Sequence, residues 1–189
     1  GEAPLQVDAQ GQALVAVAIQ EKDENRMLSA YTADGRLVLS NMVAETVFLT
    51  GETTVVRTDY TLPDAPASAT KILIDNTFQN LFVSDKTGQI HYYAINNPQE
   101  ARLVQSVNAV SSNAQITAME FLVGTVSLVV GSSKGELSQW FLVRDQHNNF
   151  DLKQIRDFEQ HPGAITQIES EYSRKGFMAI DDKGHLGIH

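Results

Sequence analysis

The sequence predicts an all-β fold: a β-propeller-like fragment of about four blades, each a four-stranded antiparallel sheet, with the last blade incomplete. Three observations predict it. Four segments of the chain end alike, in a turn closed by a glycine and followed by a strand of alternating hydrophobicity. These segments recur at nearly equal spacing along the chain. Helical periodicity is almost absent.

The repeat is marked by Gly35, Gly88, Gly135 and Gly184, which are 53, 47 and 49 residues apart. They close the turns T-A-D-G, D-K-T-G, S-S-K-G and D-D-K-G. A spacing near fifty residues suits a repeat of four short strands. We therefore predict that these four glycines form the structural turns of the repeat.

Positions at fixed distances from the glycines agree in chemistry, which indicates three strands in each repeat. Two residues after the glycine, in an alternating strand, stand Leu37, Ile90, Leu137 and Leu186. Five residues before it, in the strand that leads into the turn, stand Ala30, Val83, Val130 and Ala179. Sixteen residues before it, in an earlier strand, stand Ile19, Ile72, Met119 and Ile168. Each repeat is thus predicted to be a hairpin preceded by a further strand.

A fourth strand is predicted in three of the repeats, over Thr53–Tyr60, Ala101–Val107 and Phe150–Phe158. We expect one domain over 1–189 that is part of a larger propeller, with blades at approximately 11–61, 66–108, 113–159 and 162–189. An elongated β-solenoid is the alternative fold, but its usual rungs are shorter.

Composition excludes several classes of protein. With 14 Lys and Arg against 23 Asp and Glu the net charge is −9, and no basic cluster is larger than the Arg174–Lys175 pair, so nucleic acid is not expected as a partner. The absence of cysteine excludes disulfides, thiolate metal sites and a cysteine nucleophile. No apolar run approaches the roughly 20 residues that cross a bilayer.

One motif has the form of a catalytic site. Gly131-Ser132-Ser133-Lys134-Gly135 matches G-x-S-x-G, the nucleophile elbow of α/β hydrolases, which requires a strand, a turn and a helix. Here the motif aligns with the turns of the other repeats and precedes an alternating strand, so we predict a hairpin turn and no catalytic residue.

No metal, cofactor or phosphate site is expected. The histidines lack metal-ligand spacing, so His161 is predicted to be structural and the others to lie on the surface: His91, His147, His185 and His189. A charged run, Glu21–Asn25, and a turn pair, Asp181–Asp182, lack the alternating oxygen ligands of a calcium loop and are predicted to be solvated turns. Neither a glycine-rich helix start nor an arginine cluster offers a phosphate site.

The repeats resemble diverged WD repeats. Trp140 stands five residues after Gly135, where that family keeps its tryptophan, and Tyr93 has the same place in the second repeat. In the fourth repeat, H-P-G-A-I from His161 to Ile165 resembles the family's histidine followed by a β-branched residue. The resemblance implies structural roles for Trp140, Tyr93 and His161. No Asp follows Trp140, and the other repeats replace the histidine by Gln12, Ala65 and Ser112, so we expect blades held mainly by apolar packing.

A second resemblance lies at the carboxyl end. The stretch R-K-G-F-M-A-I-D-D-K-G-H-L-G-I-H, from Arg174 to His189, is similar to the large propeller-like insert of long-form permease subunits of the bacterial phosphate ABC transporter. That resemblance implies a periplasmic domain of an inner-membrane protein, reaching the membrane only through flanking segments. It also implies protein partners, namely other transporter subunits or the phosphate-binding protein.

We therefore expect a non-catalytic interaction or sensing domain. One alternative is a propeller enzyme with its site at the central channel, but the first strands carry no converging carboxylates or histidines: Val15–Ile19, Ala69–Ile72, Ile116–Met119 and Ile165–Ile168. Another is a free-standing WD-type scaffold. Because the chain starts at Gly1 and stops at His189 inside a predicted strand, we expect an excised fragment. Pro4–Asp8 could supply a closing strand, and open strand edges could pair two copies.

Overall fold

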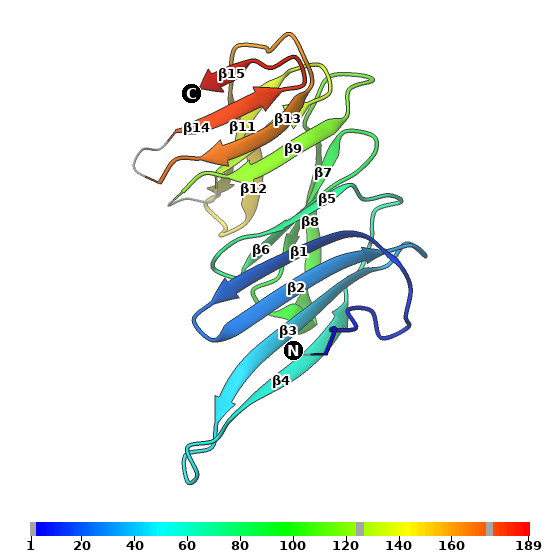
Figure 1. Ribbon diagram of the computed structural model, residues 1–189, viewed down its shortest axis with the longest axis vertical. Helices are drawn as coiled ribbons and strands as arrows, with labels where there is room; N and C mark the ends of the chain where they lie inside the picture. The colour runs from blue at the N-terminus through cyan, green and yellow to red at the C-terminus, as the bar shows by residue number, and fades with distance from the viewer. Residues whose placement is uncertain (1–2, 124–126, 173–175) are drawn as a thin grey trace. The chain divides into compact units, whose positions relative to one another are not determined.

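The computed structural model describes residues 3–123, 127–172 and 176–189, and these form fifteen strands and one short 3-10 helix (Figure 1). The strands make four antiparallel sheets, each in simple sequence order. Three sheets have four strands and the last has three, so the predicted number of strands per repeat is confirmed. We number these sheets blades 1 to 4.

Blades 1 and 2 occupy the first part of the chain. Blade 1 consists of β1 (Leu14–Lys22), β2 (Asn25–Thr32), β3 (Leu37–Thr46) and β4 (Thr53–Thr61). Blade 2 consists of β5 (Lys71–Ile74), β6 (Asn80–Ser84), β7 (Gln89–Ala94) and β8 (Arg102–Asn108), with the 3-10 helix η1 (Pro98–Glu100) between the last two. The strands predicted over Thr53–Tyr60 and Ala101–Val107 correspond to β4 and β8. Strand β4 ends one residue later than predicted, and β8 begins and ends one residue later.

Blades 3 and 4 follow. Blade 3 consists of β9 (Ile116–Phe121), β10 (Ser127–Ser132), β11 (Leu137–Arg144) and β12 (Phe150–Asp157). Blade 4 consists of β13 (Ile165–Ser170), β14 (Phe177–Asp181) and β15 (Leu186–Ile188). A bulge interrupts the register of the first strand with the second in blades 1, 3 and 4. Such a bulge increases the local twist of a strand.

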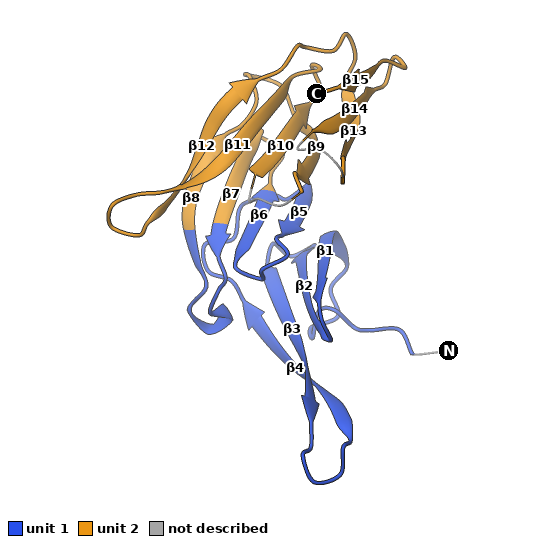
Figure 2. Ribbon diagram, turned by 90° about the vertical axis from the view of Figure 1, so that its left-hand side faces the viewer, with its two compact units in different colours: residues 1–83, 93–103 blue, residues 84–92, 104–189 orange. Residues whose placement is uncertain are grey.

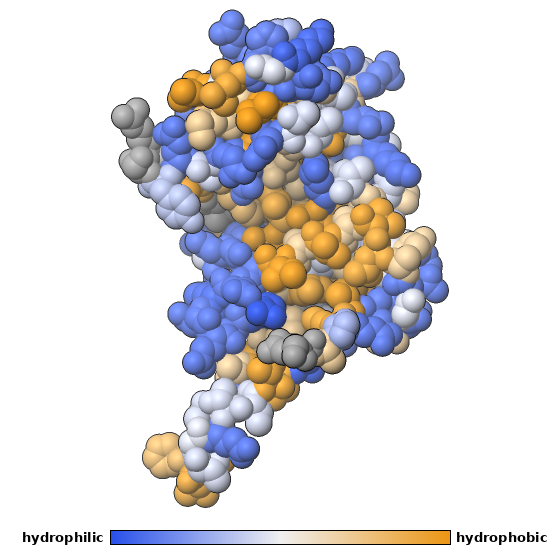
Figure 3. Space-filling model, viewed as in Figure 1, coloured by the Kyte–Doolittle hydropathy of each residue, from blue (hydrophilic) through white to orange (hydrophobic). Residues whose placement is uncertain are grey.

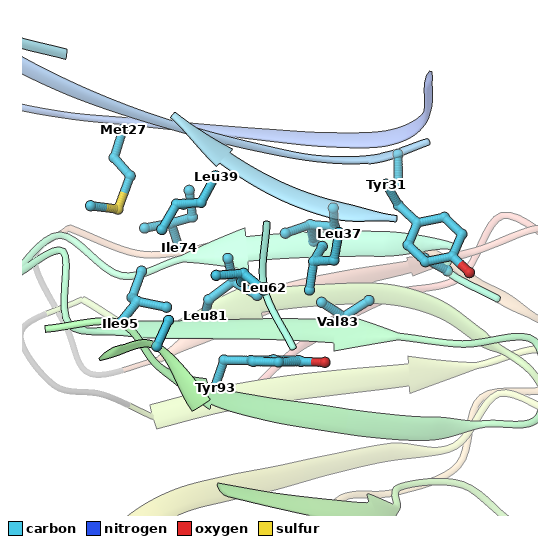
Figure 4. Packing of buried hydrophobic residues seen from close by; sticks show 14 residues of the cluster. Met27, Tyr31, Leu37, Leu39, Leu62, Ile74, Leu81, Val83, Tyr93 and Ile95 are labelled. Atoms are coloured by element: carbon cyan, nitrogen blue, oxygen red, sulfur yellow. The ribbon is translucent and has the colours of Figure 1, made fainter. Parts of the chain in front are cut away.

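The chain forms two compact units, which divide blade 2 between them (Figure 2). Unit 1 comprises residues 1–83 and 93–103, and unit 2 comprises residues 84–92 and 104–189. In unit 1, apolar side chains of blade 1 and blade 2 pack together in one buried cluster that includes Leu37, Leu39, Ile74 and Tyr93 (Figure 4). Burial of this apolar area stabilises the packing of the two sheets.

Unit 2 has a corresponding cluster between blades 3 and 4. It contains Val129 and Leu137 of blade 3 together with Ile165, Ile168 and Phe177 of blade 4. All five side chains are at most 5% exposed. Leu137 and Ile168, which mark the repeat in the sequence, thus lie in the packing surface between these blades, as their alternation predicts.

The segment before β1 is held without forming a strand. Arg57 of β4 donates hydrogen bonds to the carbonyl oxygens of Gln6 (2.7 Å) and Val7 (2.9 Å). Arg36 holds both oxygens of Asp8, at 3.0 and 2.8 Å. The prediction of a strand over Pro4–Asp8 is wrong, because the guanidinium of Arg57 occupies the carbonyls of Gln6 and Val7 that a strand would use for pairing.

We expect this anchor to loosen at low pH. The hydrogen bond from Arg36 lowers the pKa of the Asp8 carboxyl from 3.8 to about 2. Since the folded pKa is below the unfolded one, the stabilisation is complete above about pH 4 and is lost as the pH falls towards about 2. Urea unfolding should therefore find Asp8→Asn less stable than the wild type at neutral pH and nearly equal to it at the acidic limit. Asp151→Asn is the control, since the exposed carboxylate of Asp151 lies 3.6 Å from Lys153. A difference in stability between Asp8→Asn and the wild type that stays the same at every pH would contradict this account.

Candidate functional site

The four turn glycines have one backbone conformation. Their φ angles are +85° at Gly35, +85° at Gly88, +81° at Gly135 and +81° at Gly184. This is the left-handed region, which a residue with a Cβ adopts only at a cost. Each glycine lies between the second and third strands of its blade, where the sequence places it.

A repeated oxygen acceptor, which the sequence analysis missed, stabilises each of these turns. The residue three positions before the glycine has a side-chain oxygen that accepts a hydrogen bond from the backbone N–H of the residue after the glycine. These acceptors are Thr32 (3.0 Å), Asp85 (3.1 Å), Ser132 (3.2 Å) and Asp181 (2.8 Å). Side chains that bond their own backbone a few residues on are typical of tight turns. The signal was present in the sequence as Thr, Asp, Ser and Asp at one position of the repeat.

The turn of one blade packs against the loop that leads into the next blade. In unit 2 the carbonyl oxygen of Gly135 accepts the N–H of His161 at 2.9 Å. A Cβ at Gly135 would lie 2.0 Å from the carbonyl oxygen of His161 and 2.7 Å from that of Gly163. A Cβ at Gly88 would likewise lie 2.5 Å from Val110. Glycine is therefore needed here for close approach as well as for its φ angle.

The carboxylate of Asp181 lies close to two histidine rings at the turn of blade 4. Its Oδ2 lies 3.0 Å from Nδ1 of His185 and 3.4 Å from Nδ1 of His161. Burial raises the pKa of the Asp181 carboxyl, but hydrogen bonds from the N–H groups of His185, Gly163 and Lys183 and from the His185 ring outweigh it and leave the pKa well below its usual range. Asp181 is buried, so the prediction of a solvated turn is wrong for this residue, whereas His161 is buried as a structural residue would be.

Two further histidines differ from the surface positions predicted for them. His91 is buried, with Nε2 2.8 Å from Asp85 and Nδ1 2.7 Å from the hydroxyl of Ser106. Both ring nitrogens have partners, which is why the ring can be buried without an unpaired polar group. His189 is half-buried, stacked on Phe177 with ring centroids 4.9 Å apart. Burial lowers the pKa of His189, and the charge of His161 lowers it further.

Tyr93 and Trp140, the residues at the tryptophan position of WD repeats, are both buried. The hydroxyl of Tyr93 donates to the carbonyl oxygen of Asp64 at 2.8 Å within unit 1. Burial raises the pKa of Tyr93 to about 12, with the charge of Asp64 adding to the effect. In unit 2 the indole N–H of Trp140 donates to the hydroxyl of Ser138 at 2.9 Å. Each ring thus fills space in its blade and satisfies its one polar donor.

Ser133 lies in the hairpin turn between β10 and β11. Its hydroxyl oxygen accepts the N–H of Gln115 at 2.9 Å, and its own N–H donates to the carbonyl oxygen of Gln115 at 2.9 Å. A strand follows the turn, in place of the helix that a nucleophile elbow needs.

Among the described residues, no group of three or more His, Asp or Glu side chains is placed to hold a metal ion. Within the same residues, no helix has the length and apolar character to cross a membrane.

The hairpin between β3 and β4 ends in an apolar tip, which we define as Val47, Phe48 and Leu49. Phe48 is 98% exposed and Leu49 is 92% exposed. Figure 3 shows hydrophobic surface at the end of this hairpin. The backbone of the tip is ordered by hydrogen bonds from the N–H groups of Gly51 and Thr50 to the carbonyl oxygen of Val47, at 2.8 and 3.3 Å.

The charge around the tip is negative. Glu45 and Glu52 flank it, and no Lys, Arg or His lies between Leu37 and Val56. The corresponding connections in the other complete blades are polar, I-N-N-P-Q-E-A over 95–101 and D-Q-H-N-N over 145–149. Among the three complete blades, an apolar tip with an acidic border is thus particular to blade 1.

Comparison with solved structures gives the Dos1 propeller as a match. The match covers 93% of this chain and 41% of that chain, at 14% sequence identity and a TM-score of 0.63. The fold is β-propeller-like. The predicted fold class is therefore confirmed, with three complete blades and a fourth of three strands. At this identity the likeness concerns the fold alone, and the chain spans less than half of the propeller that it matches.

Protein-family models give no match to this chain, and curated proteins give none either. The resemblance of Arg174–His189 to a permease insert therefore stays a prediction. Of that stretch the structure describes Gly176–His189, which forms β14, the glycine turn and β15, while Arg174 and Lys175 lie outside the described residues.

Proposed function

We propose that this chain is a non-catalytic, extracytoplasmic interaction domain of an ABC-type phosphate transporter permease. The apolar tip of the β3–β4 hairpin carries the proposal. Phe48 and Leu49 are almost fully exposed on an ordered hairpin, so binding a partner would bury much apolar area with little loss of backbone freedom. Its acidic border favours a partner with an apolar pocket edged by basic residues.

Two further observations support the proposal. A β-propeller is a rigid scaffold whose hairpins and loops are free to bind other proteins. The stretch from Arg174 to His189 resembles the insert of long-form phosphate permeases. The non-catalytic part of the proposal is supported by Ser133, whose hydroxyl bonds a backbone N–H within a hairpin turn.

Photo-crosslinking tests the proposal in cells that produce the complete protein. With p-benzoylphenylalanine in place of Phe48, irradiation should give a cross-link to another subunit of the phosphate transporter or to its phosphate-binding protein. The added substitution Leu49→Asp should reduce the yield about 10-fold, because it places a charge in the apolar contact.

The control carries the same probe in place of Ile155, which is exposed on β12. That probe should give no transporter cross-link. A cross-link from position 48 to a protein outside the transporter would overturn the transporter assignment. Equal cross-linking from both positions would overturn the role of the tip.

A further inference from the structure

The two buried clusters between blades use the same positions of the repeat. In unit 1, Leu37 of β3 and Ile72 of β5 belong to one cluster. In unit 2, Leu137 of β11 and Ile168 of β13 belong to the other. Each leucine stands two residues after a turn glycine, and each isoleucine stands sixteen residues before the next turn glycine. At each of these interfaces, the leucine of one blade and the isoleucine of the following blade thus lie on opposite sides. We call these two sides the leucine half and the isoleucine half of the interface.

Blade 4 leaves the leucine half of this interface uncovered. Leu186 corresponds to Leu37 and Leu137, yet it is 58% exposed whereas they are 0% and 1% exposed. Ile188 is 70% exposed, and Ile180 pairs with Leu186 across β14 and β15. We call Ile180, Leu186 and Ile188 the outer face of blade 4.

The turn of blade 4 is open as well. A Cβ at Gly135 would collide with the loop before β13, and a Cβ at Gly88 would collide with the loop before β9. At Gly184 nothing described lies within 4 Å of such a Cβ. Both the apolar face and the turn of blade 4 therefore have the form of a surface that receives a following blade.

Blade 1 leaves the isoleucine half uncovered. Val17 pairs with Ala30 of blade 1 as Ile168 pairs with Ala179 of blade 4, yet Val17 is 52% exposed whereas Ile168 is 5% exposed. Ile19, two residues further along β1, is 58% exposed. Val17 and Ile19 point to the same side of β1, because they alternate with Ala16 and Ala18 of the buried cluster. Figure 3 shows hydrophobic surface over β1 and β2. We call Val17 and Ile19 the outer face of blade 1.

We propose that the outer face of blade 4 in one molecule packs on the outer face of blade 1 in a second copy of this chain. The contact continues the interface that the chain already makes between its own blades, with Leu186 in the place of Leu137 and Val17 in the place of Ile168. Charged residues border both apolar patches: Glu169 lies on the side of Met178 and Ile188 in blade 4, and the ion pair of Glu21 with Arg26 follows Ile19 on its side of blade 1. The contact is heterologous, since two different surfaces meet. It differs from the edge pairing expected from the sequence, because side chains on sheet faces carry it, and it is independent of the transporter assignment.

Sedimentation equilibrium of the 189-residue chain tests the proposal. Wild-type protein should associate as its concentration rises to about 0.1 mM. Leu186→Glu and Ile19→Glu should each raise the dissociation constant at least about 10-fold and leave monomers. A mixture of the two variants should form a complex with one copy of each, because each variant keeps the face that the other has lost.

Ile155→Glu is the matched control and should associate like the wild type, since Ile155 is exposed on β12 outside both faces. Equal urea midpoints check that the variants fold, and Ile188→Gln with Val17→Gln is a milder pair for the same mixing experiment. A wild-type chain that stays monomeric at about 0.1 mM overturns the proposal. So does unchanged association of Leu186→Glu and Ile19→Glu, which would assign the contact to strand edges, or a mixture of monomeric variants that fails to combine.

Discussion

Gly135→Ala is expected to lower the free energy of unfolding by about 3–5 kcal/mol. Two costs add at this position. The φ angle of +81° strains any residue that has a Cβ. The new Cβ would also lie 2.0 Å from the carbonyl oxygen of His161, which is backbone and cannot turn aside as a side chain would. Urea unfolding followed by the fluorescence of Trp140, which is buried in the same blade, measures the change.

Gly184→Ala is the control that separates the two costs. Gly184 has the same φ angle of +81°, but nothing described lies within 4 Å of its Cβ position. We therefore expect a loss of only about 1–2 kcal/mol, the cost of the backbone conformation. Equal losses for the two variants would mean that the approach of the loop before β13 to the turn of blade 3 contributes nothing.

The repeat was predictable from the sequence because its signals are local. A strand with one buried face alternates every second residue, and a tight turn calls for glycine at one place, so both patterns can be found without knowing what lies opposite. Strands β4, β8 and β12 accordingly begin and end within one residue of the predicted bounds. The oxygen acceptors at Thr32 and Asp181 were missed because Thr, Ser and Asp differ in size and charge, although all three accept the same hydrogen bond.

The wrong predictions for His91 and for the N-terminal segment arise from hydrogen-bond partners that are distant in the sequence. His91 is buried because Ser106, fifteen residues away, and Asp85 satisfy its two ring nitrogens. The N-terminal segment has no strand because Arg57 reaches Gln6, 51 residues away in the sequence. Nothing in the local pattern of either residue identifies its partner, and burial of a polar ring is decided by the partner.

Exposure of the candidate binding surfaces was equally hidden in the sequence. Ile19 and Leu186 carry the same apolar pattern as the residues that form the blade interfaces. In the structure Ile19 and Leu186 are each 58% exposed, whereas Ile72 and Leu137 are 4% and 1% exposed. The pattern of a sequence predicts which side of a strand is apolar, but whether a neighbour covers that side depends on the assembled fold.

Phe177→Ala is expected to lower the free energy of unfolding by about 3–5 kcal/mol through the loss of packing between blades 3 and 4. Phe177 is 1% exposed and belongs to the buried cluster of unit 2. The edge of Phe158 meets its ring with centroids 4.9 Å apart at 85°. Such edge contacts add to the energy of burial. Urea unfolding of the 189-residue chain measures the loss.

Phe150→Ala removes an aromatic ring of the same size from the surface of the same unit. Phe150 is on β12, where it is 39% exposed and carries the guanidinium of Arg144 at 5.2 Å from its ring centroid. We expect a loss of about 1 kcal/mol or less, the value of an exposed cation-π contact. If the two variants differ strongly in free energy of unfolding but have equal denaturant slopes, unit 2 unfolds cooperatively, and its interblade cluster couples blades 3 and 4. If Phe177→Ala instead lowered the slope while unfolding began earlier, blade 4 would unfold separately from blade 3, and the cluster would be a boundary of cooperativity.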